Sequence, residues 1–501
     1  MRETYETLVR QEWTGFRSRG RLIAMTAAML VTALVGVLFA ILISTRSVCS
    51  NGPVEIPCPA DPVGPQGQAV NDTFYFAHQP LADNGSITVR MTSMTGTITY
   101  PPPNHDQIVS GLVPWAKAGV IIKDGTTQGS QYAALMVTAS HGVRMQYDYT
   151  EDIAGSPGGV SQQAPRWLRL TRSGNTITGH ESADGSQWTE VGTVQLPGLP
   201  QTVQIGLFAA SPGDLTIKTV ALGAGISESR FTQASAVFDN LKVEGAPAGD
   251  WQHGSVGQMG QTDWEKYHRP PGFVQANGTY TITGTGDIGP ADSAGGHPME
   301  ESLMGLVVGL IIVLVVAVRF AAADRSRLTG RRLAAKAIVI GAVTFASGLV
   351  AAAVVTVLGP MIMSANNLTV VLVSVFTHVR VVVGVAALLA VAAVFALAIG
   401  VLVRRTWVGI VVAISTLVVP YLLATLPLLP DAVADWLLRL TPAAAFAVKQ
   451  TIQEYPQVVA HYAPSAGYLP LPGWAGFAVL CGCTAVLFGL ALRRLSGAVQ
   501  R

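Results

Sequence analysis

Residues 21–44 read RLIAMTAAMLVTALVGVLFAILIS, an apolar run in which only the first residue, Arg21, is charged. A helix needs roughly 20 apolar residues to cross about 30 Å of hydrocarbon. Five more runs of this kind follow, at residues 303–323, 334–358, 380–403, 407–428 and 474–493. Residues 45–302, between the first two runs, are much more polar. We therefore predict a polytopic α-helical membrane protein with six transmembrane helices and a domain inserted between helices 1 and 2.

Arginine and lysine predict the orientation, because they are enriched in the cytoplasmic segments that flank membrane spans. The basic clusters lie at residues 10–21, 325–336, 404–405 and 493–501. With six crossings all four fall on one side of the membrane, whereas Arg46 and Arg380 lie on the other side. We predict a multi-pass plasma-membrane protein with cytoplasmic termini and with residues 45–302 extracytoplasmic. The stretches 1–20 and 494–501 are then cytoplasmic, and residues 431–472 form an outward loop.

Several classes of protein are disfavoured by composition and motifs. The chain has 501 residues, is 12% charged and has a net charge of +2, so we expect no nucleic-acid partner. A secretory signal would have an apolar core of about 7 to 15 residues, shorter than the first run, so we expect that run to be retained. No G-x-x-x-x-G-K-[ST] loop occurs. We therefore expect neither an ATPase activity of the chain's own nor a bound cofactor or metal.

The four cysteines fall into two groups. Cys49 and Cys58 lie in a Pro/Gly-rich stalk, residues 45–71, on the side predicted to be oxidising, so we expect them to form a disulfide. Cys481 and Cys483 lie within the sixth apolar run and have no neighbouring metal ligands in the sequence. We interpret them as small packing residues.

The inserted block has the pattern of an antiparallel β-sandwich. In residues 167–194, WLRLTRSGNTITGHESADGSQWTEVGTV, apolar and polar residues alternate between turn signals at residues 173–175 and at Asp184-Gly185. This predicts a three-stranded meander with a tight Asp-Gly turn. Further strands are predicted at residues 86–92, 118–123, 132–138, 142–148, 202–209, 236–243 and 279–283. We assign residues 72–298 to the sandwich and its C-terminal extension, and expect the Gly-rich stretch before Met304 to be a flexible tether.

Within this block, residues 115–120 (WAKAGV), 132–135 (YAAL), 167–174 (WLRLTRSG), 182–185 (SADG) and 238–240 (FDN) resemble the concanavalin A-like lectin/glucanase (LamG-like) jelly roll. Glucanases need two carboxylates at close spacing. Glu181, Asp184 and Glu190 do not reproduce that spacing, so we expect no hydrolase activity. Five aromatic residues could either stack on a sugar or pack in the core, and we favour the core. They are Trp115, Tyr147, Tyr149, Trp167 and Trp188.

Two amphipathic helices are predicted outside the spans. Tyr5, Val9, Trp13 and Phe16 recur at helical spacing before the first run, which indicates a helix in the membrane interface. A second amphipathic helix is predicted from Asp431 to Gln453, bounded or kinked by prolines. The spans themselves lack an acidic residue or lysine at mid-membrane, so an ion-coupled transporter is disfavoured.

Residues 8–14 (LVRQEWT), 332–337 (RLAAKA), 400–405 (GVLVRR) and 471–476 (LPGWAG), in this order and spacing, resemble the permease subunit of type-2 ABC transporters of the actinobacterial kind. The resemblance implies an exporter subunit with an elbow helix that contains Glu12, Trp13 and Phe16. It also implies a second permease subunit, identical or paralogous, and a separate ATP-binding subunit that holds ATP and Mg²⁺. The candidate contacts with that subunit are Asp324, Arg325, Arg327, Arg331 and Arg332.

Two alternatives remain open. The arginines between the second and third spans could serve only to set the topology. The whole chain could also be a membrane-anchored sensor or a carbohydrate-binding tether of the cell envelope, with no transport activity. In either case the sandwich could bind a glycan or an envelope protein, and the lipid bilayer surrounds the spans.

Overall fold

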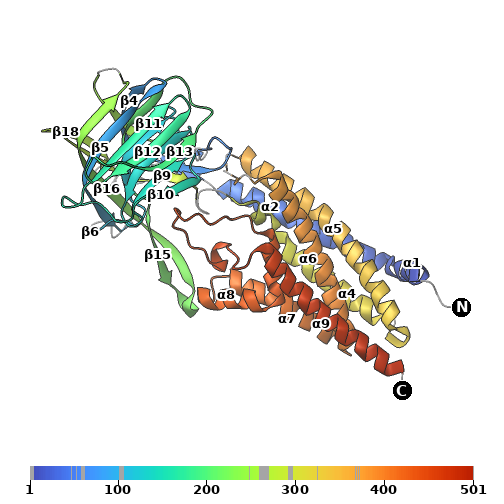
Figure 1. The fold of residues 1–501 in the computed structure, drawn as a ribbon. Helices are drawn as coiled ribbons and strands as arrows, with labels where there is room; N and C mark the ends of the chain where they lie inside the picture. Colours follow the sequence, from blue (N-terminus) through green and yellow to red (C-terminus); the bar gives the residue numbers. More distant parts are fainter. Residues whose placement is uncertain are drawn as a thin grey trace.

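The computed structural model describes residues 5–46, 48–51, 54–57, 62–100, 107–246, 249–258, 270–291, 297–323, 325–366, 368, 370–371 and 373–499. It consists of a helix bundle with a β-sandwich at one end, called here the sandwich end (Figure 1). Both chain termini lie at the opposite end of the bundle, called the far end (Figure 1). The sandwich is inserted between the first and second membrane-length helices, as the sequence predicts.

Six helices in the described residues are long and apolar enough to span a membrane, which confirms the predicted fold class. They are α2 (Arg19–Arg46), α4 (Leu306–Ala322, preceded by the 3-10 turn η2, Met299–Gly305), α5 (Gly330–Ala365), α6 (Val375–Leu402), α7 (Thr406–Thr425) and α9 (Gly473–Val499). The short helices are α1 (Tyr5–Phe16), η1 (Ala221–Gly223), η3 (Arg325–Arg327), α8 (Asp431–Leu440), η4 (Pro442–Lys449) and η5 (Pro464–Ala466). Helix α5 continues past the predicted end at residue 358, through Pro360, and is capped at its start by Thr329, whose side chain accepts a hydrogen bond from the Arg332 amide.

The sandwich consists of two antiparallel sheets. The smaller has the order β10-β9-β8-β7-β14-β4-β17, formed by Glu151–Ala154, Val143–Tyr147, Tyr132–Thr138, Lys117–Lys123, Val203–Ala210, Phe74–Leu81 and Gln252–Val256. The larger has the order β13-β12-β11-β5-β16-β19-β18, formed by Thr189–Gln195, Thr176–Ser182, Arg166–Ser173, Asn84–Thr99, Gly225–Glu244, Thr279–Gly284 and Gly272–Ala276. Strands β6 (Ile108–Ser110) and β15 (Asp214–Thr219) pair with β5 and β16. Two small ribbons complete the described strands, β1 (Val48–Asn51) with β2 (Val54–Pro57) and β3 (Val70–Asp72) with β20 (Ile288–Pro290).

Alternation along the strands explains the core between the sheets. Leu168 and Leu170 of β11 are fully buried, whereas Trp167 and Arg169 point to the other face and are only half-buried. The inward residues of β11 pack with those of β7, β8 and β14. The predicted strands are present, and the predicted meander is formed by β11, β12 and β13.

The predicted tight Asp184-Gly185 turn is wrong. Strand β12 ends at Ser182 and β13 begins at Thr189, so the loop is longer than two residues, and only Gly185 has a positive φ. Asp184 instead accepts hydrogen bonds on Oδ1 from the backbone amides of Ser186 (2.8 Å) and Gln187 (2.9 Å). The aspartate side chain therefore organises an open loop rather than a two-residue turn.

The outer face of the smaller sheet is buried by the chain's own connections to the membrane. Phe74, Phe76 and Phe208 on this face are fully buried beneath the β3–β20 ribbon and the segments beside it. Two buried ion pairs fix these segments: Lys123 Nζ lies 2.8 Å from Asp72 Oδ2, and Lys117 Nζ lies 2.6 Å from Asp287 Oδ1. The segments that enter and leave the sandwich are thus held side by side against it.

The predicted amphipathic helix over residues 431–453 is two helices. Thr441 adopts an extended conformation before Pro442, because the residue that precedes a proline is disfavoured in the helical region. Helix η4 then packs between α6 and α9, where Gly384, Gly473 and Gly476 let the backbones approach closely. Tyr421 of α7 stacks on Phe446 of η4, with ring centroids 3.8 Å apart.

Candidate functional sites at the two ends of the bundle

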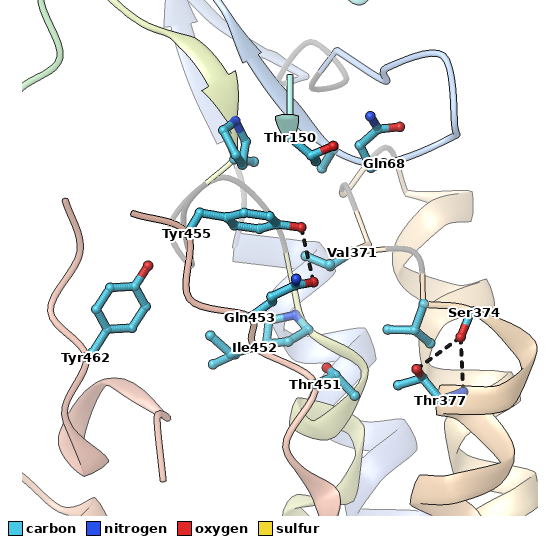
Figure 2. Close-up of a pocket in the computed structure, with 15 residues that line it drawn as sticks. Gln68, Thr150, Val371, Ser374, Thr377, Thr451, Ile452, Gln453, Tyr455 and Tyr462 are labelled. Carbon is cyan, nitrogen blue, oxygen red and sulfur yellow. Dashed lines mark hydrogen bonds between the residues drawn. The ribbon is translucent and has the colours of Figure 1, made fainter. Parts of the chain in front are cut away.

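A pocket of about 280 Å³ lies at the sandwich end, where the sandwich meets the helices (Figure 2). Its walls come from the sandwich, from the start of α6 and from the loop between η4 and α9. They are lined by Gln68, Ala69, Thr150, Pro290, Ala291, Pro298, Val371, Val373, Ser374, Thr377, Thr451, Ile452, Gln453, Tyr455 and Tyr462. The pocket is therefore shared between the insert and the membrane part.

Buried polar groups hold the sandwich wall of the pocket in place. Asp148 and Tyr149 both have positive φ, an unfavourable conformation for these residue types, and they direct the chain into Thr150. The Tyr149 hydroxyl donates to Asp72 Oδ2 at 2.7 Å and also contacts Lys123 Nζ. Burial raises the pKa of Tyr149 far above its usual range, and burial lowers the pKa of Lys123 although Asp72 opposes that shift. The tyrosine therefore remains a neutral donor.

A buried glutamate holds the membrane wall. Glu300 of η2 accepts a hydrogen bond on Oε1 from the Thr451 amide at 2.7 Å and on Oε2 from the Thr451 hydroxyl. The two walls are then joined directly, because Gln457 Nε2 donates to the Thr150 carbonyl at 3.0 Å. Within the membrane wall, the Val371 amide donates to the His297 carbonyl at 3.1 Å, which ties the segment before α6 to the segment before η2. The pocket thus has a fixed frame.

The described lining contains hydroxyl, amide and apolar side chains and no charged one. Figure 2 shows Ser374 bonded to Thr377 at the start of α6, and Tyr455 bonded to Gln453 across the loop. Such a lining can hydrogen-bond an uncharged polar molecule while covering its apolar faces, but it offers no ionic partner to a strongly charged one. We find no side chain placed for nucleophilic or acid–base chemistry among these residues.

The elbow helix α1 is fixed at the far end by an ion pair. Glu12 Oε2 lies 2.6 Å from Lys336 Nζ of α5, and both side chains are nearly buried. The same ammonium lies 4.0 Å from the ring centroid of Phe320, on whose edge Phe16 packs at 5.2 Å. Phe16 is fully buried, whereas Trp13 is 40% exposed.

The side of α1 that faces the bundle is formed by Leu8, Glu12 and Phe16, spaced four residues apart. Tyr5 and Trp13, predicted to share one apolar face with Phe16, are exposed. Trp13 remains free to sit at headgroup depth, whereas Phe16 belongs to the bundle core. The helix therefore has two apolar sides, one against protein and one directed outward.

The predicted partner-contact arginines have different environments. Arg325 donates to the carbonyls of Gly400 and Val403, each at 3.0 Å, so it caps the end of α6 and is not a free surface group. Arg327 and Arg331 are exposed and Arg332 is half-buried, whereas Asp324 lies outside the described residues. Other exposed arginines share the far end, namely Arg10, Arg17, Arg19, Arg404, Arg405, Arg493 and Arg494.

The five candidate platform aromatics do not form one surface. Tyr149 is buried under the smaller sheet, Trp115 is buried and stacks on His141 at 4.0 Å, and Tyr147 packs against the core. Trp167 and Trp188 lie on the outer side of the larger sheet, where each is already covered by an arginine. Arg169 lies 3.8 Å from the Trp188 ring centroid and Arg90 lies 5.8 Å from that of Trp167.

The remaining sequence predictions concern cysteines and metals. Cys49 pairs with Ile56 in the β1–β2 ribbon, but Cys58 lies outside the described residues, so the disulfide stays a prediction. Cys481 and Cys483 are free. Among the described residues no three His, Cys, Asp or Glu side chains converge as metal ligands.

Sequence reasoning missed the residues that carry these sites. Glu300, Lys336 and Gln457 are each nearly buried, and each satisfies a partner far away in the sequence. A charge at the edge of an apolar run is the one signal that could have marked Glu300 and Lys336, because a charge there needs a partner.

Comparisons with known proteins assign neither a family nor a function to this chain. No family model matches the chain, and no curated protein is significantly similar to it in sequence. Three similar solved structures are a functionally unknown protein from Saccharomyces cerevisiae (14% identity, 41% of this chain and 94% of that one, TM-score 0.23), scytalido-glutamic peptidase with a transition state analog inhibitor (10%, 42% and 98%, 0.26) and peanut lectin with a 9mer peptide (11%, 48% and 96%, 0.19). At such identities no activity carries over. By its own helices and strands the chain is a multi-pass membrane protein with an inserted antiparallel β-sandwich.

Proposed function

We propose that this chain is the membrane-spanning permease subunit of a type-2 ABC exporter, driven by a separate ATP-binding subunit that holds ATP and Mg²⁺. The observation that supports it best is the fixed surface at the far end of the bundle. There the elbow helix is joined to α5 by the buried Glu12–Lys336 pair, and exposed arginines surround it. A passive anchor needs no such surface, whereas a pump must receive force from its ATPase.

The predicted topology agrees with this arrangement, because the arginine-rich far end would be cytoplasmic, where ATP is available. The sandwich and the uncharged pocket would then face outward. In this proposal the sandwich binds a glycan or an envelope protein near the exit of the pathway. A second permease subunit, identical or paralogous, would complete the pathway.

The test starts from the tagged full-length chain purified from native membranes. We expect a P-loop ATPase to co-purify, as identified by mass spectrometry, and its ATP turnover in proteoliposomes to rise when this chain is present. Arg327→Glu with Arg331→Glu should reduce that stimulation without unfolding the bundle, because both side chains are exposed.

The matched control is Lys242→Glu, an exposed charge reversal in β16 of the sandwich, which should leave ATP turnover unchanged. Arg325 is left intact because it caps α6. If no ATPase co-purifies and none is stimulated, the chain is a passive sensor or tether. If an ATPase is stimulated equally by the double variant, the proposed contact surface is wrong while the transporter proposal stands.

A further inference from the structure

The hairpin formed by β15 and β16 leaves the sandwich and extends toward α8 (Figure 1). Near its base Arg230 Nε lies 2.6 Å from Asp214 Oδ2, which stiffens the ribbon. At its tip the chain touches the turn that leads into α8, since a Cβ built on Gly223 would lie 3.0 Å from Pro430 Cγ. The hairpin therefore reaches the bundle at the boundary between α7 and α8.

The tip of this hairpin is apolar and uncovered. Leu222 is 77% exposed, and Ile217 and Ile226 are each close to half exposed. Leu222 also has φ +65°, a conformation that a leucine rarely adopts. In water such a tip would be unfavourable, so the exposure needs an explanation in the surroundings of the chain.

Helix α8 carries a matching apolar side. Val433, Trp436 and Leu440 follow one another at helical spacing and are 50%, 58% and 73% exposed, whereas Ala434 and Leu438 pack into the bundle. Helix α8 begins only six residues after the membrane-length helix α7 ends at Thr425, so it lies at the membrane boundary. A tryptophan is typical of this depth, because its ring is apolar and its N–H is polar.

Basic side chains accompany both elements. Lys218 near the hairpin tip and Arg439 in α8 are exposed, whereas the acidic residues near them, Glu228, Asp431 and Asp435, are only partly exposed. Apolar side chains flanked by cations suit the boundary between acyl chains and phosphate headgroups. They suit a protein partner less well, because the apolar groups are spread over a thin ribbon and one helix rather than gathered around a pocket.

We propose that the β15–β16 tip and α8 together enter the headgroup layer of the leaflet on the sandwich side, with phospholipid as their partner. The sandwich then has a membrane contact of its own in addition to its two covalent connections. This contact would fix the height of the sandwich above the pocket. The proposal does not depend on transport and would hold equally for a sensor.

The test uses the full-length chain in phospholipid nanodiscs, with the native cysteines replaced by alanine. A nitroxide is attached at Leu222→Cys, and separately at Ile226→Cys and at Ser229→Cys, which lies nearer the base of the same hairpin. For each nitroxide, the collision rate with oxygen, which concentrates in lipid, is compared with the collision rate with a water-soluble nickel complex. We expect the oxygen-to-nickel ratio to be several-fold higher at 222 and 226 than at 229.

Equal ratios at the three positions, with free access of nickel, would overturn the proposal because the tip would be in water. Protection of 222 and 226 from both reagents would also overturn it, since the tip would then be covered by protein. A label at Trp436→Cys gives the reference for membrane depth. If it is lipid-exposed while 222 is not, the hairpin has no part in the membrane contact.

Discussion

Removing one partner of the Glu12–Lys336 pair tests whether the elbow helix is held as the structure indicates. Lys336→Ala would leave the Glu12 carboxylate nearly buried without its cation and would also remove the ammonium from the Phe320 ring. Breaking a buried pair from one side costs about 3–5 kcal/mol. We expect the lower part of that range, because Glu12 retains some exposure. At about 1.4 kcal/mol per tenfold change, the undocked state of α1 should become at least about a hundredfold more populated.

Hydrogen exchange followed by mass spectrometry, on the protein in nanodiscs, measures this directly. Exchange of the α1 amides should accelerate by about the same factor if the helix opens and closes faster than its exposed amides exchange, while α6 should remain as protected as before. The double variant Glu12→Gln with Lys336→Met is the control, because replacing both members of a buried pair is often nearly neutral. Unchanged α1 exchange in Lys336→Ala, or equal acceleration in the double variant, would refute the reasoning.

Three further predictions concern topology and the sandwich. A membrane-impermeant maleimide should label Ser186→Cys but not Gly15→Cys in intact cells, and the reverse pattern would contradict the predicted orientation. In residues 60–298 expressed alone, Phe238→Ala should lower the free energy of unfolding by about 3–5 kcal/mol, because Phe238 is fully buried. Trp188→Ala should lower it by only about 0.5–1 kcal/mol, because it removes the contact with Arg169. Equal losses would show that Trp188 is a core residue. Hydrogen bonds from Arg90 hold the pKa of Asp239 below its usual range, so its stabilisation is present above about pH 4 and is lost as pH falls through the folded-state pKa. The free energy of unfolding, measured by denaturant titration, should therefore fall less between pH 5 and pH 3 for Asp239→Asn than for the parent sandwich.

The helices and strands follow from local patterns, which explains why they could be predicted. An apolar run of membrane length has few alternatives to a spanning helix, and the alternation around Leu168 and Leu170 fixes which side of β11 is buried. The Asp184-Gly185 turn failed because the aspartate carboxylate found amide donors within its own loop. Local propensity does not report such a competing set of hydrogen bonds.

The sites could not be predicted in the same way, because their residues meet across long sequence separations. The Lys123–Asp72 pair lies on a sheet face that a sandwich could equally leave in water. Nothing in the sequence near Asp72 indicates that its partner lies in β7. The same holds for Gln457 and Thr150, which lie on opposite walls of the pocket. Helix α1 illustrates a subtler limit. Its apolar spacing predicts amphipathicity, but which side packs on protein depends on partners in other helices, Phe320 and Lys336.

The contacts at the sandwich end bear on how the proposed function could work. Glu300 stands at the entry to α4 and holds the backbone of the 451–452 segment, while Gln457 in the same loop holds the sandwich at Thr150. A displacement of α4 along its axis would therefore pull on a loop that lines the pocket and touches the insert. Because the Gln457–Thr150 hydrogen bond joins the two walls, a change in the shape of the pocket has to move the loop or break that bond. Movement of the helices, which in our proposal is driven from the far end, thus has a direct physical route to the uncharged pocket and to the sandwich above it.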